Sequence, residues 1–125
     1  MKKLKKRYLF LDDTRYPYLI NNSYENDAYN YTKFKLFKEK KWDIVRSYIE
    51  FTNYIEFNGI EDIFISFDHD LGIGKTGYDC AKWLCNYCLD NNLKFPDYYI
   101  HSRNTIGAIN IKRYIDNYIK NIENV

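Results

Sequence analysis

The stretch ISFDHDLGIGKTGYD, residues 65–79, contains two features that suggest different kinds of site. GIGKTG resembles a phosphate-binding loop, whereas FDHD offers acidic side chains to a metal ion. A loop of the G-x-x-x-x-G-K-[ST] type would need a glycine at position 69, where this chain has His69. We therefore assign the chemistry to FDHD, and we expect the glycines to form a sharp turn after a strand: Gly72, Gly74 and Gly77.

Both flanks of this stretch have clear patterns. Residues 62–67, DIFISF, are mainly apolar, which predicts a strand buried on both faces. Thr76 and Asp79 have the spacing of a capping box, so a helix should begin there. Its N-terminal N–H groups could still bind one phosphate. The expected buried face of this helix comprises Ala81, Leu84, Cys85, Cys88 and Leu89.

The rest of the chain also alternates between strands and helices. Strands are predicted at residues 8–11, 44–48 and 98–100. Helices are predicted at residues 51–58 and 111–122. We expect a long loop over residues 14–30 and one or two helical turns within 33–41. The alternation predicts a three-layer α/β fold, with a mostly parallel sheet of about four strands flanked by helices, in one domain over residues 1–125.

Polar side chains gather where the predicted strands end. In chain order they are Asp12 and Asp13; Arg46 and Ser47; Asp68, His69 and Asp70; and His101, Ser102 and Asn104. The carboxyl ends of parallel strands lie at one edge of the sheet, and ligands of open α/β sheets bind there. The sequence therefore predicts a functional site at this edge.

The aspartates form a candidate metal site. Asp12, Asp13 and Asp68, with Asp70 from the FDHD motif, offer the oxygen ligands that Mg²⁺ prefers. Carboxylates packed together without a cation would repel one another, and their pKa values would rise. We expect Mg²⁺, with Mn²⁺ as the second choice. The alternative is that some of these aspartates cap turns or face water.

The two histidines of the chain, His69 and His101, both follow predicted strands. Histidine suits proton transfer near neutral pH, so both are candidate acids or bases. The alternative is a structural histidine held by hydrogen bonds.

Composition excludes several classes of protein. The 125 residues are 46% hydrophobic and 29% charged, which is typical of a globular chain, and a net charge of +2 gives no signature of DNA binding. No apolar run is long enough to span a membrane. Three cysteines form no disulfide framework, and Cys85-x-x-Cys88 lacks a second pair for zinc, so we expect core packing and a cytoplasmic location.

Four stretches together resemble the cyclic-phosphate-processing receiver domain family, a branch of the receiver fold (flavodoxin-like) of two-component signalling. They are LFLDDTRYP (9–17), WDIVRSYIE (42–50), ISFDHDLG…TGYD (65–79) and IHSRNTIGAIN (100–110). The four stretches have the order and spacing of the family, and the match covers most of the chain.

The resemblance implies roles for particular residues. Asp12 and Asp13 resemble the acidic pair of receivers, Asp68 the phosphoacceptor aspartate, and Ser102 the hydroxyl residue of the fourth strand. This branch adds further polar residues to the receiver pattern. The residues of this chain that resemble them are Arg15, His69, Asp70, His101 and Asn104. Two features depart from the pattern. The fifth strand of ordinary receivers, which carries a lysine, has no counterpart here. Residues 18–41 form a longer connection than is usual in the family, and we expect them to be a lid or an insertion.

The resemblance implies a metal-dependent phosphoesterase that acts on cyclic phosphates of nucleotides or RNA ends. The expected catalytic residues are Asp68, His69, His101 and Ser102, and the expected substrate-binding residues are Arg15, Arg46 and Asn104. One alternative is a module that binds the same ligands without cleaving them. Another is a receiver phosphorylated on Asp68.

Overall fold

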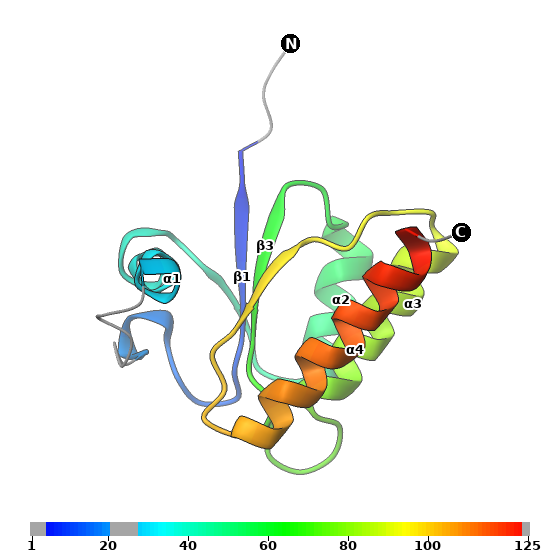
Figure 1. Ribbon diagram of the computed structural model, residues 1–125. Helices are drawn as coiled ribbons and strands as arrows, with labels where there is room; N and C mark the ends of the chain where they lie inside the picture. The colour runs from blue at the N-terminus through cyan, green and yellow to red at the C-terminus, as the bar shows by residue number, and fades with distance from the viewer. Residues whose placement is uncertain (1–4, 21–27, 124–125) are drawn as a thin grey trace.

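The computed structural model describes residues 5–20 and 28–123, which form a four-stranded parallel sheet flanked by helices (Figure 1). The strands are β1 (Arg7–Leu11), β2 (Asp43–Val45), β3 (Ile63–Phe67) and β4 (Asp97–Ile100). The helices are the 3-10 turn η1 (Pro17–Leu19), α1 (Ala28–Glu39), α2 (Tyr48–Asn58), α3 (Gly77–Asp90) and α4 (Thr105–Glu123). The strand order β2-β1-β3-β4 is that of the first four strands of a receiver-like sheet, which confirms the predicted fold class.

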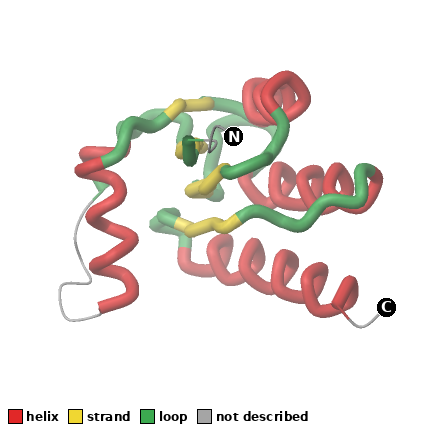
Figure 2. Tube along the Cα trace, turned by 90° about the horizontal axis from the view of Figure 1, so that it is seen from above, coloured by secondary structure: helices red, strands yellow, loops and turns green. Residues whose placement is uncertain are grey.

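Two apolar layers hold the helices to the sheet. Alternate residues of a strand face opposite sides, so Leu9 and Leu11 of β1 join the layer under α2, α3 and α4, whereas Phe10 joins the layer under α1. The strands therefore lie between α1 and the other three helices (Figures 1 and 2). All five residues of β3 are buried, as predicted for a strand covered on both faces.

The second strand ends earlier than predicted. We expected a strand over residues 44–48, but β2 stops at Val45, and Tyr48 is already helical. The Ser47 side chain accepts a hydrogen bond from the Glu50 N–H and so caps α2. Serine followed by glutamate three residues later is a signal of a helix start, and it outweighs the β propensity of the local residues.

The segment between β1 and β2 is more helical than predicted. The expected loop over residues 14–30 contains η1 and the start of α1, and its residues 21–27 lie outside the described part. α1 spans 12 residues rather than one or two turns. Phe37 packs its ring 5.2 Å from Trp42, whose indole N–H donates to the Leu36 carbonyl. Because tertiary packing supplies most helical stability, the weak local pattern underestimated this helix.

The turn and helix after β3 agree with prediction in most respects. Thr76 and Asp79 form the predicted capping box, and Gly72 and Gly74 have positive φ angles of 82° and 100°. The first N–H groups of α3 already donate to the chain, including Gly77 N–H to the His69 carbonyl at 2.7 Å. Leu89, which we placed on the buried face, is 60% exposed.

None of the helices in the described part of the chain has the length and apolar character that a membrane span requires.

The three cysteines are free and buried in the core. Burial raises the pKa of the Cys85 thiol to about 12 and that of Cys88 to about 11, so both remain protonated at neutral pH. The expected packing role is confirmed, since neither thiol has the lowered pKa of a redox pair.

Cys85→Ser is expected to lower the free energy of unfolding by about 1–3 kcal/mol, because it buries a hydroxyl in place of a thiol. Urea denaturation measures this loss. Any rise in melting temperature with added Mg²⁺ or Mn²⁺ should be unchanged, because Cys85 lies in α3 within the apolar core. A loss of that rise would contradict the purely structural role of this thiol.

Candidate functional site

Three buried polar residues continue the sheet by one row beyond its strands. Leu11 pairs with Phe67, and Phe67 pairs with Ile100, so the next residues are Asp12, Asp68 and His101. Backbone hydrogen bonds extend into this row: Asp68 N–H donates to Leu11 and His101 N–H donates to Phe67, each at 2.9 Å. The three side chains thus come together because their strands stop in register.

The Asp12 carboxylate is fully buried and accepts four hydrogen bonds. Oδ1 accepts from the N–H groups of Thr14 and Arg15, and Oδ2 accepts from Arg15 Nε at 2.8 Å and His101 Nε2 at 3.0 Å. Burial alone would raise the pKa of Asp12, but the bonds from His101 and the two backbone N–H groups outweigh it and hold the pKa well below its usual range. Asp12 is therefore an anion at neutral pH.

His101 is buried with both ring nitrogens engaged. Its ring stacks on Phe10 with centroids 4.3 Å apart, and Nδ1 lies 2.6 Å from Ser66 Oγ. Because a carboxylate can only accept, Nε2 carries the proton toward Asp12, and Nδ1 accepts from the Ser66 hydroxyl. Burial lowers the pKa of His101, so the ring is neutral and acts as a hydrogen-bonded support for Asp12.

Asp68 has the opposite electrostatic character to Asp12. Burial and the nearby Asp12 charge raise the pKa of Asp68 to about 6, despite hydrogen bonds from the His69 N–H and Ser102. Arg15 Nη2 is 3.6 Å from Asp68 Oδ1, too far for a good hydrogen bond. Asp68 is thus a buried carboxylate with too little compensating positive charge.

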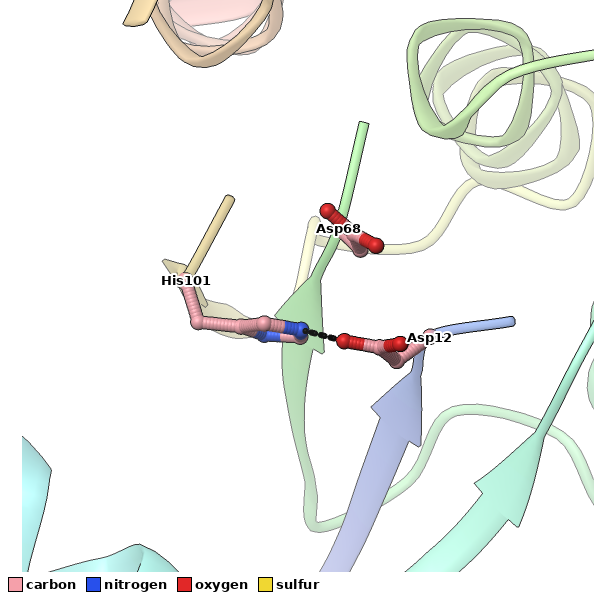
Figure 3. A group of neighbouring side chains, drawn as sticks. All are labelled: Asp12, Asp68 and His101. Carbon is pink, nitrogen blue, oxygen red and sulfur yellow. Dashed lines mark hydrogen bonds and ion pairs between the residues drawn. The ribbon is translucent and has the colours of Figure 1, made fainter. Parts of the chain in front are cut away.

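Asp12, Asp68 and His101 bring three candidate metal-ligand atoms together, although the His101 Nε2–H is already donated to Asp12. One ligand atom from each lies within 4.8 Å of the others, and Figure 3 shows the Asp12 carboxylate and the His101 ring pointing toward each other beside Asp68. Two carboxylates suit a hard cation, and the raised pKa of Asp68 shows that added positive charge would be favourable there. Asp13 and Asp70, the other predicted ligands, lie outside this group.

His69, Asp70 and Asn104 form a second polar cluster. His69 Nδ1 lies 2.8 Å from Asp70 Oδ1, and the Asn104 amide donates to the same carboxylate oxygen at 3.2 Å. These bonds lower the pKa of Asp70. The arrangement orients the His69 ring, and its Nε2 makes no hydrogen bond to any residue that the structure describes.

Two glycines allow the chain to pack closely around these residues. A Cβ on Gly77 would lie 1.7 Å from the Asp68 carbonyl oxygen, and one on Gly107 would lie 2.4 Å from the His69 ring. Gly77 therefore serves close packing rather than the sharp turn we predicted for it. Asn104 holds Gly107 in place beside the His69 ring, because the Asn104 Oδ1 accepts a hydrogen bond from the Gly107 N–H at 2.8 Å.

Arg46 and Asp13 lie at the border of the site. Arg46 Nη1 donates to the carbonyls of Asp12 and Arg15, and its guanidinium lies 4.7 Å from the centre of the Tyr16 ring. Arg46 thus holds the loop that carries Arg15. Asp13 lies outside the buried group, and its Oδ2 lies near Gly72 in the turn after β3.

Sequence reasoning missed Ser66 and Gly107. Ser66 was counted only as part of an apolar strand, although a hydroxyl in such a strand signals a buried partner. Gly107 lies within the motif IHSRNTIGAIN, where a glycine inside a helix indicates close packing.

The fold and the acidic strand ends define a receiver-like α/β domain. The family model for the cyclic-phosphate processing receiver domain matches residues 7–117, from β1 into α4. The chain belongs to this family, as its resemblance implied, and is thereby associated with cyclic-phosphate processing. No curated protein and no solved structure matches the chain.

Proposed function

We propose that this chain is a divalent-metal-dependent phosphoesterase that opens cyclic phosphates of nucleotides or RNA ends. The observation that carries the proposal is the buried Asp12–Asp68–His101 group, with Arg15 placed against both carboxylates. It lies at the edge where ligands of this fold bind. Membership of the family supports a cyclic phosphate as the substrate class.

The proposed ion is Mg²⁺ or Mn²⁺, with Asp12 and Asp68 as its carboxylate ligands. We centre it on these two residues because Asp13 and Asp70 lie outside the group. When bound, such an ion would neutralise phosphate charge and lower the pKa of a coordinated water. Arg15, whose Nε is committed to Asp12, would offer its terminal nitrogens to non-bridging phosphate oxygens.

His69 is better suited to proton transfer than His101. The Asp70 carboxylate holds its Nδ1 at 2.8 Å, so Nε2 can act as the base, as in other Asp–His pairs. Both nitrogens of His101 are committed to Ser66 and Asp12. We therefore assign proton transfer to His69, orientation of its ring to Asp70, and support of Asp12 to His101. Ser102, which donates a hydrogen bond to Asp68 in this structure, would donate it to the phosphate instead when the ligand binds.

Incubation with a panel of 2′,3′-cyclic nucleotides and Mg²⁺ or Mn²⁺, followed by ³¹P NMR, tests the proposal. Ring opening to a phosphomonoester is expected, and EDTA should abolish it. His69→Gln should lower kcat by about 10²–10⁴-fold, as expected on loss of a general base. Asp97→Asn, a change at a 76% exposed carboxylate, is the matched control and should be active. Absence of turnover across the panel in the wild type would refute the proposal.

One observation favours a second candidate, a module that binds the ligand without cleaving it. Arg15 already pairs with Asp12 at 2.8 Å, so half of the acidic site is neutralised without a metal. In that case cyclic nucleotides would raise the melting temperature, and the ligand would be recovered intact.

A further inference from the structure

A cavity of about 470 Å³ lies beside the candidate site, between α1 and the end of β4. This volume is within the range of small-molecule sites. α1 belongs to the segment between β1 and β2. The segment therefore builds a wall of a cavity next to the strand ends.

The lining of this cavity combines two kinds of side chain. One group is apolar and mainly aromatic: Ile20, Phe34, Phe37 and Tyr99. The other group is polar and basic, and it includes Arg15, Ser102 and Arg103. Arg15 and Ser102 also contact the acidic group, through Asp12 and Asp68 respectively, so the cavity opens directly beside it.

The aromatic wall has a rigid base. Phe37 is only 3% exposed and stacks on Trp42, and Tyr99 packs edge-on to Phe37 with centroids 5.9 Å apart. Phe34 lies one turn before Phe37 on α1 and is less buried. Its ring is therefore the freer of the two phenyl rings to contact a ligand.

We propose that this cavity holds the base of a nucleotide, so that the substrate class is a nucleoside cyclic phosphate or an RNA terminal nucleotide rather than a base-free cyclic phosphate. This inference rests on the proposed function. Aromatic side chains stack on any base, and Arg15, which lies against Asp12 and Asp68, would hold the phosphate near Asp68. Stacking tolerates any base because every base has a π-face, so base identity should matter little for this contact.

The test compares two ligands that remain intact whether or not the chain is a catalyst: adenosine 3′-monophosphate and base-free 1-O-methylribose 3-phosphate. Calorimetry with Mg²⁺ present should show that the wild type binds the nucleotide about 5- to 150-fold more tightly, the range expected for stacking of one base. Phe34→Ala should reduce this ratio to within about threefold, and Phe34→Trp should retain it.

Phe57→Ala is the matched control, because Phe57 is a 90% exposed phenylalanine of α2, on the other face of the sheet. Its ratio should equal that of the wild type, and melting temperatures should show that all variants are folded. Equal affinities of the wild type for both ligands, binding of neither, or an unchanged ratio in Phe34→Ala would overturn this inference. Nucleotide preference without ring opening in the turnover assay would support it and overturn only the proposed catalysis.

Discussion

Asp12→Asn is expected to lower the free energy of unfolding by about 3–5 kcal/mol at pH 7, as when one partner of a buried ion pair is removed. The carboxylate accepts four hydrogen bonds, two of them from Arg15 Nε and His101 Nε2. An asparagine would keep the backbone bonds through its oxygen, but its NH₂ group would then face those two side-chain donors. The partly buried Arg15 guanidinium would also lose its counter-charge.

The pH dependence gives this prediction a second measurement. The pKa of Asp12 lies below its ordinary value of 3.8, so its stabilising effect is present above pH 3.8 and is lost as the pH falls further. Urea denaturation should therefore show the gap between wild type and Asp12→Asn narrowing below about pH 4. Asp97→Asn, whose exposed ion pair with Lys6 contributes little, should stay within about 1 kcal/mol of the wild type. A loss for Asp12→Asn no larger than that of this control would contradict the assigned network.

Asp68→Asn is expected to have the opposite effect and to raise the free energy of unfolding by about 1–3 kcal/mol at pH 7. The upper limit follows from the rise of the pKa from 3.8 to about 6, at about 1.4 kcal/mol per unit. An asparagine oxygen can still accept the His69 N–H, while the charge that burial and Asp12 disfavour is removed. This limit already includes the lost attraction to Arg15, because that attraction lowers the pKa of Asp68 and is part of the net shift.

The sign of the pH dependence is also opposite. The folded state holds the Asp68 proton more tightly than the unfolded state, so wild-type stability from this group falls as the pH rises from about 4 to about 6. The advantage of Asp68→Asn should be small at pH 4 and complete at pH 7. Urea denaturation at both values checks this. If the stability advantage of Asp68→Asn does not grow with pH, the ionised form of Asp68 is not destabilised by its surroundings as we infer.

Metal binding gives a further test of the same variant. Mg²⁺ or Mn²⁺ should raise the melting temperature of the wild type, because a ligand that binds only the folded state stabilises it. Asp68→Asn should lose this rise. If the variant instead unfolded while retaining its metal response, Asp68 would be a structural residue and the proposed site would be wrong.

The candidate site could be located from sequence because strand periodicity and topology are encoded locally. The apolar stretch that became β3 ends at Phe67, and the polar residues after it had to lie at the ligand-binding edge. The predicted end of the second strand was wrong by three residues, because Ser47 caps α2 instead of continuing β2 beyond Val45. Capping is also a local signal, so this error was avoidable.

The sequence did not predict which of two similar neighbouring or strand-end residues would take which role in the site. Asp12 and Asp13 are neighbours, yet Asp12 lies in the buried row and Asp13 faces the turn near Gly72. His69 and His101 both follow strands, yet only His101 has both ring nitrogens engaged. Such differences depend on which atoms surround each side chain.

The sequence by itself determined the alternation of strands and helices, the parallel sheet and the row of polar residues at its edge, because these follow from short-range periodicity. Only the tertiary structure decided that the pKa of Asp12 is lowered while that of Asp68 is raised, and that α1 builds an aromatic wall beside them. Burial, hydrogen-bond partners and cavity shape arise from contacts between residues distant in the chain. Asp12 and His101, for example, are 89 positions apart and meet at 3.0 Å.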